Sequence, residues 1–240
     1  GYRSIYYVDH LIGKLLDALE ETGLADETTV IAFSDHGDWA GDYGLVEKWP
    51  SGLDDCLTRV PLIIRTPGGV EGHVVEEPVE CFDIMPTTLE LTGIEELHTH
   101  AARSLVPQLH GAAGDPDRAV FAEGGYDLHE PHCFEGRRED GVCGNPKSIY
   151  YPKGLQQQEH PESVCRAAMI RTKSHKLIRR TSGKHELYDL TADPEELHNI
   201  YGQAEHLEVG RHLEQRLLEW YIETSDVTPW IPDPRGFPEN

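Results

Sequence analysis

The sequence predicts an α/β fold that is followed by a small antiparallel sheet with one packed helix. At the N-terminal end, an amphipathic helical pattern leads through a tight turn into a short apolar, β-rich run, which is the order of elements in α/β proteins. Between residues 166 and 190, three strand-like runs follow one another, and a second helical pattern at 206–223 comes after them. The length of 240 residues suits one large domain or a domain with a small subdomain.

The first predicted element is a helix over residues 2–23. Its apolar residues recur at spacings of three and four, at Ile5, Val8, Ile12, Leu15, Leu16 and Leu19. Gly23 stands where a helix C-cap is expected. The run 29–33 is then typical of a buried strand in a parallel sheet. Ligands of open α/β sheets gather at the carboxyl ends of strands, so residues 34–37 are placed to form a site.

Further elements complete the predicted α/β part. A strand is expected over residues 60–65, closed by a Pro-Gly-Gly turn. A helix is expected over 83–92, with Asp83 as a plausible N-cap. Residues 94–118 are rich in loop formers. We therefore divide the chain into a partial core at 1–115 and a C-terminal antiparallel-sheet subdomain at 116–240.

The predicted C-terminal subdomain begins with a strand at 119–123. Residues 124–163 are rich in Gly, Pro, His and Gln and form a connection too long for an ordinary loop. Three strands are expected after it, at 166–171, 175–180 and 185–190. Ser182-Gly183 marks a hairpin between the last two strands, and a Pro-rich tail ends the chain.

The net charge of the chain limits the classes of partner that it can bind. A formal net charge of -22, from 43 acidic and 21 basic residues, argues against nucleic acid or an anionic membrane as a partner. No run of 18 apolar residues is present, so we expect no membrane span. The chain opens on Gly1 and enters a helical pattern almost at once, so we expect it to start inside a domain and to be a fragment or a processed product.

The five cysteines leave the cellular compartment open. None forms a C-x-x-C pair, which argues against a zinc knuckle or a thioredoxin-like site. Cys133 and Cys143 flank a Gly-rich loop and could pair under oxidising conditions. Free thiols in a reducing cytosol fit the sequence equally well.

The segment from Ser34 to Lys48 carries the most chemical information. Asp35 and His36 offer a carboxylate and an imidazole to one divalent cation. Lys48 is a flexible cation that could reach an anionic oxygen of a substrate. Taken alone, however, an Asp-His pair beside glycines is more often a turn or capping feature, and a single lysine is usually solvated.

The spacing in this segment resembles the sulfatase family, whose signature after its metal-binding strand is S-D-H-G-x-x-x-G-x-x-G-x-x-x-K. Every position is present, at Ser34, Asp35, His36, Gly37, Gly41, Gly44 and Lys48. Other blocks in the family's order also match, at 7–13, 59–63, 83–93, 103–107, 171–177 and 186–196. The resemblance covers most of the chain and implies the C-terminal portion of an alkaline-phosphatase-like α/β core.

The resemblance implies a sulfuric ester hydrolase that acts on a small-molecule or carbohydrate sulfate ester. Asp35 and His36 would be metal ligands, and Lys48 would contact the sulfate group and neutralise charge on the leaving oxygen. Calcium is the usual metal of the family, and manganese is also compatible because imidazole is softer than an amide oxygen. His129 and His132 could line the substrate pocket or bind a metal, although an ordinary surface loop is the simpler interpretation. Trp49 could stack on a ring of the substrate or pack internally.

The family's nucleophile is missing from this sequence. It is a formylglycine made from Cys or Ser in C/S-x-P/A-x-R, and none of the Cys or Ser contexts here fits that pattern. The paired aspartates that complete the family's metal site are also absent, so we expect the missing N-terminal part of the same protein to supply both. By itself the chain is expected to bind metal weakly and to turn over little. Two alternatives stay open: a phosphodiesterase or phosphonate ester hydrolase of the same superfamily, and a non-catalytic fragment.

Overall fold

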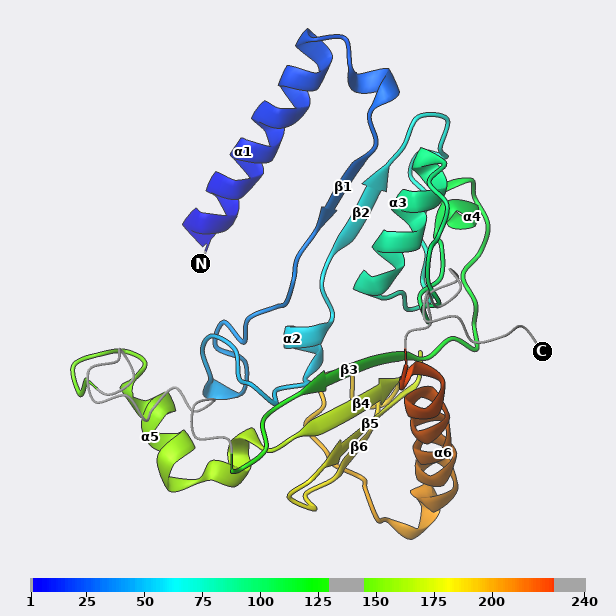
Figure 1. Ribbon diagram of the computed structural model, residues 1–240. Helices are drawn as coiled ribbons and strands as arrows, with labels where there is room; N and C mark the ends of the chain where they lie inside the picture. The colour runs from blue at the N-terminus through cyan, green and yellow to red at the C-terminus, as the bar shows by residue number, and fades with distance from the viewer. Residues whose placement is uncertain (1, 130–144, 227–240) are drawn as a thin grey trace, which may run out of the picture.

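The structure is a computed structural model that describes residues 2–129 and 145–226 (Figure 1). Its elements are α1 (Tyr2–Glu21), β1 (Val30–Phe33), α2 (Asp55–Thr58), β2 (Leu62–Arg65), α3 (Ile84–Thr92), α4 (Val106–Leu109), β3 (Val120–Gly124), α5 (Tyr151–Glu159), β4 (Ala167–Arg171), β5 (His175–Arg180), β6 (Glu186–Asp189) and α6 (Leu207–Thr224). The predicted α/β class is confirmed, and both sheets are antiparallel. The β1–β2 ribbon with its helices forms one part, and the β3–β6 sheet with α6 forms the other.

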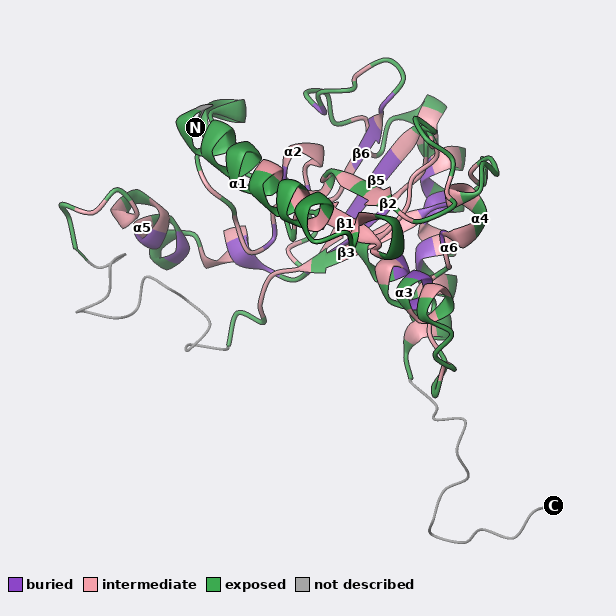
Figure 2. Ribbon diagram, turned by 90° about the horizontal axis from the view of Figure 1, so that it is seen from above, coloured by how far each residue is buried: buried purple, intermediate pink, exposed green. Residues whose placement is uncertain are grey.

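Helix α1 forms where its periodicity predicts, and Gly23 follows it with a left-handed φ of +70°. Its apolar stripe, however, is exposed, as the colouring of Figure 2 shows. Ile5 keeps 67% and Leu15 keeps 68% of its surface open to solvent. Such a stripe normally faces a core. Among the described residues, neither this helix nor any other is both long and apolar enough to cross a bilayer.

Strand β1 departs from the expected parallel pairing. It pairs with β2 in antiparallel register, with Val30 opposite Arg65 and Phe33 opposite Leu62. The strand is half-buried rather than buried, and Phe33 is 52% exposed. An apolar run of this kind suits a strand that is covered on both faces. Among the described residues, however, β1 has a single neighbouring strand, β2.

Helix α3 starts differently from the prediction. Asp83 occupies the predicted N-cap position, but its side chain makes no capping hydrogen bond to α3. A short 3-10 turn precedes the helix, with Glu80 as its N-cap and Asp83 completing a capping box. The Asp83 carboxylate is fully buried and accepts hydrogen bonds from the backbone N–H groups of Glu80 (2.9 Å) and Arg103 (2.8 Å). Arg118 neutralises it at 2.7 Å, so this carboxylate is an internal anchor.

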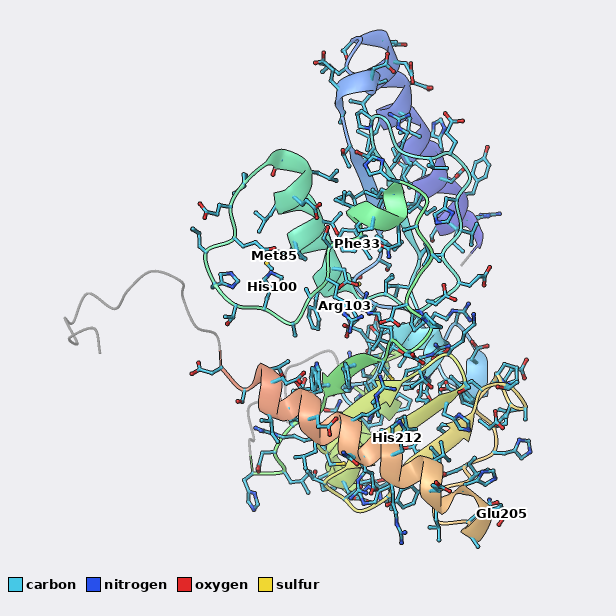
Figure 3. The ribbon with its side chains drawn as sticks, turned by 90° about the vertical axis from the view of Figure 1, so that its right-hand side faces the viewer. Phe33, Met85, His100, Arg103, Glu205 and His212 are labelled. Carbon is cyan, nitrogen blue, oxygen red and sulfur yellow. The ribbon has the colours of Figure 1, made fainter. Side chains whose placement is uncertain are left out.

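The C-terminal part is the predicted small antiparallel sheet with a packed helix. Its strand order is β3-β4-β5-β6, and Ser182-Gly183 forms the turn between the last two strands, with Gly183 at φ +81°. Figure 3 shows α6 lying along one face of this sheet, with His212 on the helix. Arg216 of α6 also donates to the backbone carbonyl of Asp117 at 2.9 Å, which ties the helix to the start of β3.

Side chains alternate between the two faces of this sheet, and each face has its own apolar core. On β4, Ile170 faces the α6 side and packs with Leu177, Leu213 and Leu217, whereas Met169 faces the other side and packs with Leu53. The second face is therefore covered by the segment that precedes α2, far away in the sequence. This contact joins the sheet to the loop that carries the candidate site.

The long connection at 124–163 is more structured than predicted. Residues 130–144 lie outside the described residues, and with them Cys133 and Cys143. The part after them forms α5 and a 3-10 turn over Pro161–Val164. Pro152 lies in the first turn of α5, where a missing backbone N–H costs nothing. The Gly, Pro and Gln content concealed this helix from a composition-based prediction.

Candidate functional site

The candidate site begins where β1 ends. Asp35 and His36 follow Phe33 and its neighbour Ser34 at the carboxyl end of the strand. The Ser34 hydroxyl donates to the His36 carbonyl at 2.8 Å, and the His36 amide donates to Asp35 Oδ1 at 3.0 Å. These local bonds turn the chain so that Asp35 Oδ2 lies 3.7 Å from His36 Nε2. A carboxylate and an imidazole therefore lie side by side at the end of β1.

The hydrogen bonds of His36 define its tautomer. His36 Nδ1 lies 2.8 Å from the Gly37 carbonyl oxygen, which can only accept, so Nδ1 carries the proton. Lys48 Nζ lies 3.0 Å from Nε2, and an ammonium can only donate, so Nε2 offers its lone pair. In this arrangement Nε2 carries the lone pair and is the donor atom that a metal would use. Asp35, His36 and Lys48, which are thirteen residues apart or fewer in sequence, form one cluster.

Gly37 explains why the motif needs a glycine at this position. A Cβ here would lie 1.9 Å from the Cys56 carbonyl oxygen, far inside contact distance. The Gly37 amide donates to the Leu57 carbonyl at 2.8 Å, which fastens the loop to α2. Close approach of two backbones, rather than a special φ, therefore requires this glycine.

The loop between Gly37 and Lys48 is held by Asp38. Its Oδ1 accepts from the amides of Ala40 (2.6 Å) and Glu47 (3.1 Å), so one carboxylate joins the two ends of the loop. The Trp39 amide donates to the Glu47 carbonyl at 3.0 Å, and the buried Trp39 ring donates to Asp54 at 3.2 Å. This network places Lys48 beside His36. The sequence analysis did not single out Asp38, although its place directly after S-D-H-G was a usable signal.

The electrostatics of the cluster favour the charged form of Asp35. The His36 amide hydrogen bond lowers the pKa of Asp35, which is therefore ionised at neutral pH. Lys48 is exposed, so its ammonium is accessible to a ligand. The cluster thus offers one anionic oxygen donor, one nitrogen donor and one cation.

The donor set fits part of a divalent-cation site. Calcium takes six to eight oxygen ligands, and Asp35 with His36 supplies two donors. Within residues 2–129 and 145–226, no group of three His, Cys, Asp or Glu side chains is placed to hold a metal. The two residues therefore fit a cation only if other parts of the protein complete its coordination.

The remaining predicted residues have varied positions. His129 is 96% exposed at its side chain and contacts Asp127 at 2.8 Å, while His132 lies outside the described residues. The segment that leads to His129 is bound close to Lys48, because the Gly125 amide donates at 2.7 Å to the carbonyl of Pro50, two residues after Lys48. Trp49 packs internally: its ring N–H donates to the Ser163 carbonyl at 2.7 Å.

A buried ion cluster behind the site was not predicted. Lys176 of β5 is fully buried and lies 2.6 Å from Asp55, and it also pairs with Glu196. Burial tends to raise the pKa of Asp55, but hydrogen bonds from Arg171 and the charge of Lys176 outweigh it and lower the pKa. Burial raises the pKa of Glu196 despite the same lysine. No local sequence signal joins residues more than 100 positions apart.

Two stretches of the chain match models of known protein families. Residues 2–94 match the sulfatase family model, and residues 145–223 match the model of the N-sulphoglucosamine sulphohydrolase C-terminal family. The chain belongs to the sulfatase family. The family is part of the alkaline phosphatase-like superfamily, and its members among the relatives are hydrolases.

Curated relatives of this sulfatase-family chain include enzymes with known names. An N-acetylglucosamine-6-O-sulfatase from Bacteroides thetaiotaomicron is 31% identical over 229 residues, which are 94% of this chain and 36% of that protein. The multifunctional alkaline phosphatase superfamily protein PehA from Trinickia caryophylli is 28% identical over 233 residues, 95% of this chain and 41% of that protein. The chain thus spans about two fifths of the length of these relatives.

Solved structures support the alkaline-phosphatase-like fold. A protein in complex with its substrate D-glucosamine-2-N,6-O-disulfate matches with a TM-score of 0.68 and 28% identity, covering 91% of this chain and 39% of that one. The phosphonate monoester hydrolase of Agrobacterium radiobacter matches with a TM-score of 0.70 and 30% identity, covering 92% and 41%. Sulfate and phosphonate ester hydrolases therefore share the scaffold seen here.

Proposed function

We propose that this chain contributes the metal-binding strand and the sulfate-contacting lysine to a sulfuric ester hydrolase. The observation that carries the proposal is the convergence of Asp35, His36 and Lys48, with Lys48 Nζ 3.0 Å from His36 Nε2 and Asp35 Oδ2 3.7 Å from the same nitrogen. A cation and two metal donors in one cluster suit an ester whose transferred group is anionic. The relatives named above support a sulfated carbohydrate as the substrate class.

The proposed chemistry assigns a role to each residue. Asp35 and the lone pair of His36 Nε2 would hold a divalent cation, which polarises the ester oxygens when bound. Lys48 would bind a sulfate oxygen and stabilise negative charge that develops on the leaving oxygen. Lys48 lies beside His36, at 3.0 Å from Nε2, and its ammonium would turn from that nitrogen to the substrate once a cation takes the lone pair. Loss of one such cation typically costs about 10²–10³ in kcat.

Calcium is the cation that we propose, with manganese as the other candidate. The carboxylate of Asp35 is a hard donor, whereas the imidazole of His36 is softer. Isothermal titration of the full-length protein with Ca²⁺ and Mn²⁺ separates the two metals. Asp35→Asn should weaken the tighter of these affinities about tenfold or more, and an unchanged affinity would show that Asp35 is not a ligand.

The nucleophile is proposed to come from outside this chain. A formylglycine would supply the attacking oxygen, and no C/S-x-P/A-x-R sequence is present within these 240 residues. We propose that the remaining part of the sulfatase core also covers the exposed apolar stripe of α1, where Ile5 and Leu15 are more than 60% open. Burying each such side chain stabilises by roughly 1.5–3 kcal/mol.

The deciding experiment is a paired assay of the full-length protein. Its kcat/KM is measured on an aryl sulfate and on the matching aryl phosphonate monoester, with Lys48→Ala as the site variant. A preference for the sulfate ester that Lys48→Ala abolishes supports the proposal. A preference for the phosphonate monoester would overturn it in favour of the second candidate, which the likeness to two phosphonate monoester hydrolases supports.

A non-catalytic role is the remaining alternative. It predicts that the gene contains no C/S-x-P/A-x-R sequence upstream of this chain and that the full-length protein hydrolyses neither ester. The chain of 240 residues alone is proposed to be inactive because it contains no such sequence. Turnover by this chain alone, lost in Lys48→Ala, would contradict that proposal.

A further inference from the structure

The backbone beside Lys48 is strained. Among the described residues, four that are not glycine have a positive φ: Ala40, Tyr43, Glu47 and Glu196. Three of them lie in the loop between His36 and Lys48, and Glu47, at φ +69°, directly precedes Lys48. A left-handed conformation of this kind costs about 1–3 kcal/mol and persists only where surrounding contacts enforce it.

Three contacts hold Glu47, two through its backbone and one through its side chain. Its amide donates to Asp38 at 3.1 Å, and its carbonyl accepts from the Trp39 amide at 3.0 Å. Its carboxylate accepts from Lys153 Nζ at 3.1 Å. The first two contacts lie within the loop itself. The third comes from α5, more than 100 residues away in sequence.

Lys153 also contacts the residue that follows Lys48. Its ammonium lies 5.9 Å from the centre of the Trp49 ring, within the range of a cation–π contact. The Lys153 side chain is only 14% exposed and that of Glu47 is 33% exposed. One amine therefore bridges both sequence neighbours of Lys48 in a partly desolvated position.

The helix that carries Lys153 is itself anchored to this loop. The ring N–H of Trp49 and the hydroxyl of Ser51 both donate to the Ser163 carbonyl, at 2.7 and 2.9 Å. The 3-10 turn Pro161–Val164 that contains Ser163 follows α5 directly. Lys153 therefore lies on a helix whose following turn is held by the residues just after Lys48.

We propose that Lys153 is a positioning residue for Lys48, which it aligns by holding Glu47 and Trp49 on either side. The inference rests on the proposed function, because it matters only if Lys48 contacts the substrate. A misplacement of about 1 Å can cost up to about 10²-fold in rate, so a contact worth little in stability can be large in kcat. An ordinary surface ion pair would affect neither the loop nor the rate.

The first test needs no catalytic activity. Hydrogen exchange is followed by mass spectrometry in peptides that cover residues 38–49 of the full-length protein. Lys153→Met should raise exchange there roughly tenfold by local opening, whereas Lys153→Arg, which keeps the charge and the cation–π contact, should not. Lys184→Met, on the exposed hairpin turn, is the matched control.

Peptides from β4 and β5 report whether the Lys153→Met variant is folded. If they lose protection as well, Glu47→Gln replaces it and should show the same local rise in exchange. Unchanged exchange at 38–49 in the folded variant would overturn the proposal.

The second test asks whether Lys153 acts through Lys48. In the full-length enzyme, Lys153→Met should lower kcat roughly tenfold or more with less than a threefold change in KM. In a Lys48→Ala background the same change should have almost no further effect, because its target is gone. Additive losses would contradict action through Lys48.

The two tests separate this inference from the proposed function. If the full-length protein hydrolyses the phosphonate monoester instead, the effect of Lys153→Met with and without Lys48→Ala is measured on that ester. If it hydrolyses neither ester, the proposed function fails. The proposal that Lys153 aligns Lys48 for catalysis then fails too, even when hydrogen exchange shows that Lys153 orders the loop.

Discussion

The two parts of this molecule bury their apolar residues to very different degrees. In α1, Ile5 and Leu15 keep about two thirds of their surface exposed, at 67% and 68%. In the C-terminal sheet, Ile170 and Leu177 are 0% exposed. Both regions have a regular apolar periodicity, and both form the elements which that periodicity predicts. Periodicity therefore specifies an element, and only a partner surface turns it into a core.

The same contrast holds for charge. At the candidate site, Asp35, His36 and Lys48 are accessible to solvent, with 84% of the Asp35 side chain exposed. Behind it, Lys176 is enclosed with Asp55 and Glu196. Open charges are available to a ligand, whereas the enclosed charges hold α2, to which the site loop is fastened through Gly37. The following substitutions test that division.

The largest effect is expected for the buried lysine. Lys176→Met leaves Asp55 and Glu196 without their shared cation and should lower the free energy of unfolding by about 3–5 kcal/mol. Urea unfolding of this chain measures it. Lys184→Met, on an exposed turn of the same sheet, should stay within about 0.5 kcal/mol. A loss below about 1 kcal/mol for Lys176→Met would mean that the cluster is not what joins the sheet to α2.

A pair of leucine truncations sharpens the comparison of cores. Leu177→Ala should destabilise this chain by about 2–5 kcal/mol because it opens a cavity between β5 and α6. Leu15→Ala, on the open face of α1, should change stability by no more than about 0.5 kcal/mol. Urea unfolding followed by circular dichroism measures both. Equal losses would show that α1 is packed in solution against something that this arrangement lacks.

Two glycine substitutions compare the site loop with the open helix. Gly37→Ala forces a methyl group against the Cys56 carbonyl oxygen and should cost about 1–3 kcal/mol. Gly13→Ala, in α1 with open space around it, should instead raise helix stability by about 0.5–1 kcal/mol. Thermal unfolding of both variants checks the signs. A neutral Gly37→Ala would contradict the close approach of the two backbones.

The smallest effect concerns pH. Because the pKa of Asp55 is lowered in the folded state, its stabilising contribution is present above about pH 4 and is lost as pH falls through the lowered pKa. Asp55→Asn removes this contribution. Below about pH 4, the unfolding free energy of the variant should therefore fall less steeply than that of the unchanged chain, by at most about 1.4 kcal/mol per pH unit. Identical slopes in unfolding series would show that Asp55 does not titrate with folding.

The sequence by itself determined the elements and the local half of the site. Helical and strand periodicities located α1, β1, β2, α3 and the C-terminal sheet with α6, because these patterns act over a few residues. The spacing of residues from Ser34 to Lys48 indicated the family and the residues of the candidate site, because those residues are close together in sequence. The composition of 124–163 concealed α5, because Gly, Pro and Gln weaken the helical signal.

Only the tertiary structure decided which surfaces meet. It paired β1 with β2 in antiparallel register, buried Asp83 as an internal anchor, and brought Lys153 to the site loop and Lys176 to α2. These contacts join residues separated by 20 to more than 100 positions, and no local pattern encodes such pairs. Their formation depends on closing long loops and on the burial that repays the lost chain entropy.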